Sequence, residues 1–154
     1  MSIFVADEQT HPVDLPAMRA LAELVVAEEG FPESSEVTLL LVSDDEMGSY
    51  NERFLTRSGP TDVLAFPVED LKPGVAPERD INDPPLLLGD IIVAPGYISL
   101  QAEEYGVTFD DEMSLMVVHG LLHLLGYDHQ TDEQAEAMET REREILAKVG
   151  RERR

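Results

Sequence analysis

The chain of 154 residues contains no cysteine. The absence excludes disulfides and thiolate metal sites, so histidine and carboxylate are the only strong metal ligands that the sequence offers. The first residues, MSIFVADEQTH, lack a basic start followed by an apolar run, and we therefore expect no secretory signal. The uncharged stretch at 113–127 is shorter than the ~18 residues of a membrane span. We expect a cytoplasmic protein with no membrane segment.

Basic residues are scarce, with 11 lysines and arginines against 32 acidic residues and a net charge of −21. Phosphate contacts need lysine and arginine, so this balance taken alone argues against a nucleic-acid binder. Residues 141–154, however, hold six of the basic residues and three acidic ones, a local charge of 6 − 3 = +3. Because charges are largely screened beyond about 8 Å at physiological salt, a small positive site can persist on this acidic protein.

The length suits one domain, which we expect to cover residues 1–154. Short apolar runs rich in leucine and β-branched residues predict strands, and helical spacing of apolar residues predicts helices. The expected strands are 2–6, 37–42, 61–66 and 86–93, and the expected helices are 15–29, 44–54, 95–105, 110–125 and 131 to about 150. Strands and helices interleave only at the start. The order predicts an α+β fold with a small mixed sheet of about four strands and helices packed on it.

Local signals mark several helix ends. Ser43 with Glu46, and Thr131 with Gln134, have the spacing of capping boxes at helix N-termini. Gly126 follows the apolar helix in the position typical of a left-handed C-terminal cap. Residues 69–85 are rich in proline, glycine and aspartate, which predicts a long loop that is functional or mobile.

Three of the four histidines fall in residues 119–129, HGLLHLLGYDH. His119 and His123 are four residues apart on a predicted helix, so their side chains lie one turn apart, about 6 Å along the axis. Gly126 breaks that helix and allows the chain to bring His129 back. A lone histidine on an apolar helix is more often a hydrogen-bonded core residue than a ligand, but three at these offsets predict a metal site. The fourth, His11, is predicted to be a surface residue.

Three neutral imidazoles leave a coordination position open, which is the arrangement of catalytic rather than structural zinc. The predicted cofactor is one Zn²⁺ ion, on a central helix and the turn after it, in a hydrolase. The offsets match the zinc-protease pattern H-E-x-x-H-x-x-G-x-x-H, except that Gly120 replaces the glutamate. Peptide hydrolysis then lacks the proton shuttle for its leaving amine. Phosphodiester cleavage depends less on that base, because neutralising phosphoryl charge is its main requirement.

HGLLHLLGYDH, together with GDI at 89–91 and PTDVLAFP at 60–67, resembles the YbeY family of bacterial endoribonucleases and rRNA maturation factors. The likeness covers most of the chain in the family's order, with Asn51 in a helix. It implies zinc held by His119, His123 and His129, and a single-strand-specific endoribonuclease. It further implies maturation of the 3′ end of 16S rRNA and ribosome quality control. The implied partners are single-stranded rRNA and the small ribosomal subunit or its proteins, without DNA.

The chain departs from that family at two positions. Members often carry a functional arginine four residues after the asparagine that matches Asn51, and Leu55 stands there. Arg57 lies two residues further on, and we expect it to stabilise phosphoryl charge. Ala65 replaces the serine of the common TDVLSFP strand. Asp128 is expected either to orient a ligand or accept a proton, or to serve as a plain turn residue.

Two rival functions stay open on sequence alone. A metzincin-like metalloprotease is favoured by the ligand spacing and disfavoured by Gly120. A non-catalytic, zinc-containing ribosome-assembly factor that binds through the basic residues 141–154 is favoured by Leu55 at the arginine position.

Overall fold

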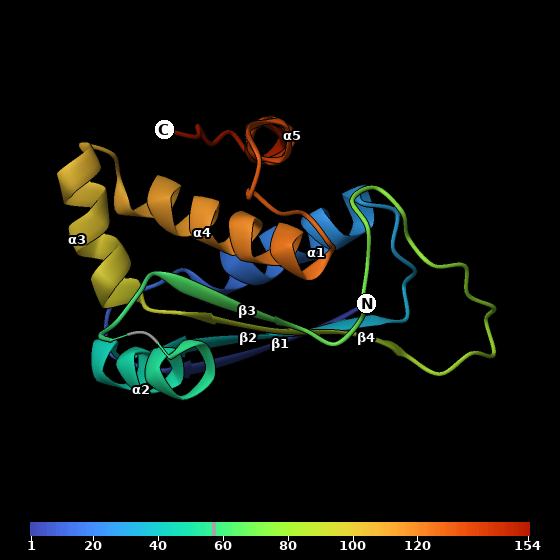
Figure 1. Cartoon of the computed structure of the whole chain (residues 1–154), viewed down its shortest axis with the longest axis horizontal. Coiled ribbons are helices and arrows are strands. Elements are labelled where there is room, and N and C mark those ends of the chain that lie inside the picture. Colours follow the sequence, from blue (N-terminus) through green and yellow to red (C-terminus); the bar gives the residue numbers. More distant parts are fainter. Residues whose placement is uncertain (57) are drawn as a thin grey trace.

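Four strands form one mixed sheet in the order β1-β2-β4-β3 (Figure 1). The computed structural model describes residues 1–56 and 58–154. Strands β1, β2 and β4 are parallel to one another, and β3 pairs antiparallel with β4 at one edge. Their bounds are Ser2–Glu8 (β1), Ser35–Val42 (β2), Val63–Pro67 (β3) and Leu86–Val93 (β4). The sheet and its helices confirm the predicted α+β fold.

The helices cover the two faces of this sheet unequally. Helices α1 and α4 lie on one face, α2 lies on the other, and α5 packs outside α4 (Figure 1). None of the helices in the described ranges is long and apolar enough to cross a bilayer. The helix bounds are Leu15–Glu28 (α1), Asp44–Leu55 (α2), Pro95–Tyr105 (α3), Phe109–Leu124 (α4) and Asp132–Lys148 (α5).

Helix α4 is enclosed on nearly all sides, which explains why its sequence is apolar almost all round. It contacts α1, α3 and α5 as well as strands β3 and β4. Its side chains Val117, Val118, Leu121 and Leu122 are fully buried. Truncating one such leucine to alanine typically lowers the free energy of unfolding by about 2–5 kcal/mol. The side chains that project from α4 are therefore held by a well-packed helix.

The predicted helix starts are confirmed at atomic level. Ser43 Oγ accepts the backbone N–H of Glu46 at 3.3 Å, and Thr131 with Gln134 forms a complete capping box. Strand β3 begins two residues later than predicted. Asp62 Oδ1 accepts the N–H of Val63 at 2.7 Å, so the side chain before the strand takes the place of a ladder partner.

The region 69–85 is a loop, as predicted, with one isolated bridge between Lys72 and Val75. His11 is less exposed than predicted, because its ring lies 4.5 Å from that of Phe109. Apolar contact with the start of α4 therefore draws this histidine partly into the protein.

Candidate metal centre

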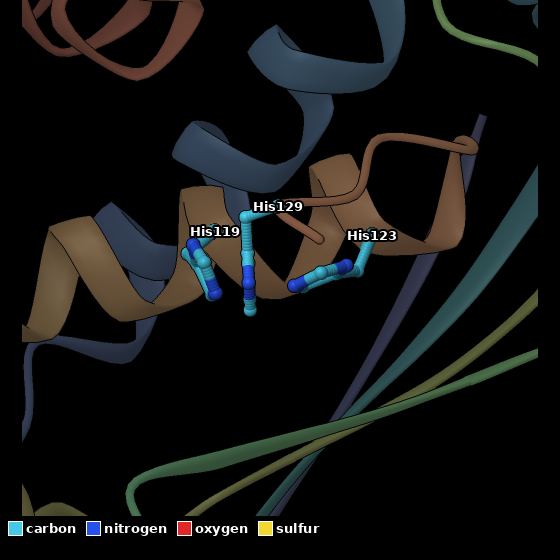
Figure 2. A group of neighbouring side chains, drawn as sticks. All are labelled: His119, His123 and His129. Carbon is cyan, nitrogen blue, oxygen red and sulfur yellow. The ribbon is translucent and has the colours of Figure 1, made fainter. Parts of the chain in front are cut away.

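The three histidines of residues 119–129 converge on one point (Figure 2). His119 and His123 project from adjacent turns of α4, and the segment after that helix brings His129 beside them. One ligand atom from each lies within 4.8 Å of the other two. The ring centroids are 4.6 to 5.5 Å apart. The three residues could therefore hold a single ion.

The protein fixes the tautomer of His123. Its Nδ1 lies 2.9 Å from the carbonyl oxygen of Tyr127. A carbonyl only accepts hydrogen bonds, so the ring proton sits on Nδ1 and the Nε2 lone pair is left for a ligand. Burial, followed by the neighbouring charges of His119 and His129, lowers the pKa of His123. The ring is therefore neutral near pH 7, as a metal ligand must be.

A buried carboxylate stands behind His119. Glu142 on α5 is 1% exposed, and its Oε2 lies 3.4 Å from His119 Nδ1. Metal-ligating histidines commonly donate their second ring N–H to such a carboxylate, which fixes ring orientation and raises ligand basicity. Arg153 Nε lies 3.5 Å from the other oxygen of Glu142 and compensates its buried charge. The arrangement fits an imidazole whose Nδ1 faces Glu142 and whose Nε2 is left for an ion.

Tyr127, whose carbonyl orients His123, is itself anchored at its hydroxyl. That hydroxyl donates to Glu29 Oε2 at 3.2 Å, and Arg141 Nε lies 2.7 Å from Glu29 Oε1. Burial and the carboxylate of Glu29 raise the pKa of Tyr127. The hydroxyl thus stays a proton donor, and the turn that carries the orienting carbonyl is tied to α1 and α5.

The basic residues of 141–154 form ion pairs with acidic side chains of the same chain. Each of the six forms an ion pair with an acidic side chain: Arg141 with Glu29, Arg143 with Glu139, Lys148 with Glu28, Arg151 with Asp111, Arg153 with Glu142 and Arg154 with Glu112. Exposed pairs of this kind contribute only about 0–1 kcal/mol each. Their positions are more informative. Arg153 pairs with Glu142, which lies next to His119. Arg141 pairs with Glu29, which accepts the hydrogen bond from the Tyr127 hydroxyl. Arg143 and Lys148 stay about half exposed, so the pairs reduce the positive surface of this segment without removing it.

Packing explains Gly120, the residue found where zinc proteases carry their glutamate. A Cβ on Gly120 would lie 2.9 Å from Cγ2 of both Ile91 and Val63. Both contacts are to β-branched side chains, which have little freedom to move aside. Helix α4 therefore rests directly on β3 and β4 at this point, and the close approach leaves no room for a side chain.

The three histidines line a cleft of about 560 Å³ between α4, strand β3 and the loop at 69–71. Asp128 lines it too, and its Oδ1 accepts the backbone N–H of His129 at 2.8 Å. Asp128 thus has at least the turn role considered from sequence. Leu55 also lines the cleft, 40% exposed. Arg57, the predicted phosphate-contacting residue, lies outside the described residues.

Asn51 and Asp62 support the walls of the cleft. The buried Asn51 donates from Nδ2 to the carbonyl oxygen of Gly59 at 2.9 Å, which ties α2 to the segment before β3. Asp62 uses both carboxylate oxygens, one for the N–H of Val63 and one for Gln101 Nε2 at 3.2 Å. Both residues therefore hold backbone in place beside the site.

Glu142 and Glu29 were not predicted from sequence. One signal was present for Glu142, which occupies the buried face of α5 between Met138 and Ile145. A glutamate at a core position of an amphipathic helix is unusual, because a buried charge needs an oppositely charged or hydrogen-bonding partner. Glu29 follows the last turn of α1, and nothing in its local sequence indicates that it meets Tyr127.

We predict that Glu142→Gln weakens metal binding about 10- to 100-fold, the usual effect of losing an outer partner of a ligand. Glutamine keeps the shape but removes the charge that polarises His119. Calorimetric titration of the metal-free protein with Zn²⁺ measures the change.

Glu139→Gln is the matched control, because Glu139 pairs with the same Arg153 at 3.5 Å and is 44% exposed. Equal zinc affinity of the two variants would contradict the assigned role of Glu142.

Comparison with known proteins places this geometry in a family. The family model described as Endoribonuclease YbeY matches residues 4–150. A relative from Thermobifida fusca named Endoribonuclease YbeY is 38% identical over 147 residues, covering 96% of this chain and 93% of that protein. One of the same name from Salinispora tropica is 39% identical over 149 residues, covering 96% and 95%.

The solution structure of TM1509 from Thermotoga maritima superposes with a TM-score of 0.61 at 29% identity, covering 96% of this chain and 91% of that one. Sequence and fold agree over nearly the whole length. The chain, with its three-histidine centre, belongs to the YbeY endoribonuclease family.

Proposed function

We propose that this protein is a zinc-dependent endoribonuclease that cleaves single-stranded RNA, with one ion held by His119, His123 and His129. The observation that carries the proposal is the set of three converging imidazoles, two of them with Nδ1 engaged, in an open cleft. Neutral imidazoles suit zinc and leave its charge uncompensated, which favours an anionic substrate. The relatives named Endoribonuclease YbeY support RNA as that substrate.

The residues of the cleft divide the work of phosphodiester hydrolysis. When bound, zinc supplies a Lewis acid that polarises a phosphoryl oxygen and acidifies water. Glu142 and the Tyr127 carbonyl face Nδ1 of His119 and His123 and so leave Nε2 of each ring for the ion. We assign Asp128 to accept a proton from the attacking water, and Arg57 to neutralise the charge that develops on the phosphoryl group.

The proposed preference for a single strand comes from the family resemblance and agrees with an open cleft beside the histidines. The histidines lie between α4, strand β3 and the loop at 69–71 in a cleft of about 560 Å³, which an extended strand enters more easily than a rigid duplex. The biological substrate that we propose is the 3′ end of 16S rRNA, in 16S maturation and ribosome quality control in the cytoplasm. The small ribosomal subunit or its proteins would then present the RNA to a protein of net charge −21.

The test is incubation of purified protein with one labelled RNA, single-stranded or annealed to its complement, with a chelator and then with zinc restored. We expect cleavage of the single strand only, its loss with the chelator and its return with zinc. Intact RNA under all conditions, together with chelator-sensitive cleavage of casein, would favour the metalloprotease instead. Intact RNA and intact casein would favour a non-catalytic assembly factor.

We predict that Arg57→Ala lowers kcat about 100- to 1,000-fold, the usual effect of removing one group that stabilises transition-state charge. Zinc content should not change, because Arg57 is not a ligand. Leu55 lines the cleft, so Leu55→Arg in the Arg57→Ala background should restore part of kcat from the position where the family carries its arginine. Single-turnover cleavage measures both.

Arg79→Ala is the control, since Arg79 lies in the loop at 69–85 and does not line the cleft. Unchanged kcat in Arg57→Ala would exclude Arg57 from the reaction.

A further inference from the structure

A second hollow lies on the opposite face of the sheet from the histidines. Its walls are the rings of Tyr50 and Phe54 on α2 and of Phe66 on β3, and we call it the aromatic cup. It encloses about 370 Å³, and its remaining lining residues are Thr38, Leu40, Asp90 and Ile92. Phe54 is 53% exposed, so a large aromatic surface faces solvent here.

The three rings contact one another in one stacked pair and one edge-on pair. The Phe54 ring lies 6.1 Å from Tyr50, nearly parallel at 20°, and 5.4 Å from Phe66, edge-on at 68°. The guanidinium of Arg53 lies 5.2 Å from the centre of the Phe54 ring. Aromatic platforms with a neighbouring arginine are the usual means by which proteins hold unpaired nucleobases.

The aromatic cup and the metal cleft share one lining residue on the edge strand β3. Phe66 lines both hollows. Phe54 lines the cup, and the next residue, Leu55, lines the cleft. Because β3 is the edge strand, a polymer in the cleft can pass around β3 and place its next unit in the cup.

Polar groups on the sheet give the cup a chemical preference. Thr38, Asp90 and Phe66 are register partners on neighbouring strands, so they form one row across its floor. A carboxylate accepts a hydrogen bond from the exocyclic amino group of cytosine, adenine or guanine. Uracil has no such group. Its base-edge donor is the ring N3–H, so any preference that Asp90 gives the cup is for the exocyclic amino group over this ring N–H.

We propose that the aromatic cup binds one unpaired nucleobase of an RNA strand whose backbone runs through the metal cleft, with an amino-bearing base preferred over uracil. The choice of RNA rests on the proposed function. The location rests on the three rings, Arg53, Asp90 and the shared Phe66. Stacking of one base contributes about 5- to 150-fold in affinity, enough to fix the strand's register relative to the histidines.

Tryptophan fluorescence provides the test, because the chain contains no tryptophan. Phe54→Trp places a single reporter in the cup, and His123→Ala in the same protein prevents cleavage during titration. The probes are RNA octamers of cytosine, of uracil, and of abasic units. We expect saturable quenching by the cytosine octamer, about 10-fold weaker binding of the uracil octamer, and no quenching by the abasic one. The same quenching is then measured by rapid mixing of RNA with the Phe54→Trp protein that keeps His123. Rapid mixing records binding before the RNA is cleaved.

Phe4→Trp is the matched control. Phe4 is 54% exposed and is the register partner of Thr38 on β1, at the far edge of the sheet. Its fluorescence should respond much less than that of Phe54→Trp, because Phe4 adjoins Thr38 but lies at the opposite edge of the sheet from the ring of Phe66. In the otherwise unaltered enzyme, Phe54→Ala should raise KM for the cytosine octamer about 10-fold without changing kcat or zinc content, and Phe54→Tyr should restore KM.

The outcomes separate this proposal from the proposed function. Cleavage of the octamer without quenching in the Phe54→Trp protein overturns the cup and leaves the nuclease. Quenching without cleavage by the unaltered protein overturns the nuclease and supports the cup as an RNA-binding site. Equal quenching in Phe4→Trp, or quenching by the abasic octamer, overturns the cup. Self-association by light scattering with no response to RNA would assign the rings to a second copy and overturn it too.

Discussion

The His123→Ala protein is expected to lose zinc binding and at least ~100-fold of its RNA cleavage, more than the loss of an outer partner causes. His123 supplies one of three ligand atoms within 4.8 Å of one another. It is also the ligand whose neutral state is most favoured, because burial and the neighbouring histidines lower its pKa, while the Tyr127 carbonyl holds its proton on Nδ1. Two imidazoles hold zinc too weakly to survive dialysis. Elemental analysis after dialysis measures the metal, and cleavage of single-stranded RNA measures the activity.

His11→Ala is the matched control because His11 is the one histidine outside residues 119–129. Its ring packs on Phe109, so its loss should lower stability slightly while zinc content and cleavage stay unchanged. Full activity in dialysed His123→Ala protein would remove His123 from the metal site.

Gly126→Ala should have the second large effect, on stability and metal affinity together. Gly126 has φ +103, and a Cβ there would lie 2.4 Å from the carbonyl oxygen of Leu71. The left-handed backbone costs about 1–3 kcal/mol for a residue with a side chain, and overpacking against backbone adds about 1–3 kcal/mol. We expect a loss of about 2–6 kcal/mol in the free energy of unfolding. Urea denaturation measures it.

Relief of the clash with Leu71 should also displace the backbone at residue 126 and the turn that carries His129. The zinc affinity of the folded Gly126→Ala protein should therefore fall. Gly106→Ala is the control, since Gly106 also has positive φ, +68, but nothing lies within 4 Å of its Cβ position. That variant should lose only about 1–2 kcal/mol and keep its zinc affinity. Equal losses in the two variants would show that the contact with Leu71 carries no energy.

The convergence of the histidines was predictable because it is local. Helical periodicity sets His119 above His123, and one glycine with positive φ returns the chain to His129. The same holds for strand β4 and helix α3, whose predicted bounds are those observed. For each of them the sequence signal lies within a few residues along the chain, even where the contacts that stabilise the element are distant, as for β4 with β2.

The groups behind the histidines were not predictable in the same way. Glu142 is 23 residues from His119, and Glu29 is 98 residues from Tyr127. The first pair meets because α5 packs on α4, and the second because α1 packs on α4. With 32 acidic residues in the chain, charge alone could not select these two. Gly120 similarly looked like a missing catalytic residue, whereas its position is set by contact with Ile91 and Val63.

Residues 141–154 show a related limit of sequence reasoning. Their local +3 charge suggested a surface for an RNA or protein partner, but the structure pairs all six basic residues with acids of the protein. Net charge over a segment does not reveal which charges face each other after folding. Arg153 and Arg141 instead stabilise the carboxylates that position the metal ligands.

Titration of metal-free protein with zinc, with RNA cleavage as the readout, tests the central claim most directly. The three histidines form a single site, so cleavage should rise in proportion to added zinc and reach its plateau at one ion per chain. The His123→Ala protein should show no rise over the same range. Full cleavage by the metal-free protein, or a rise that is the same in His123→Ala, would contradict a catalytic metal held by these histidines.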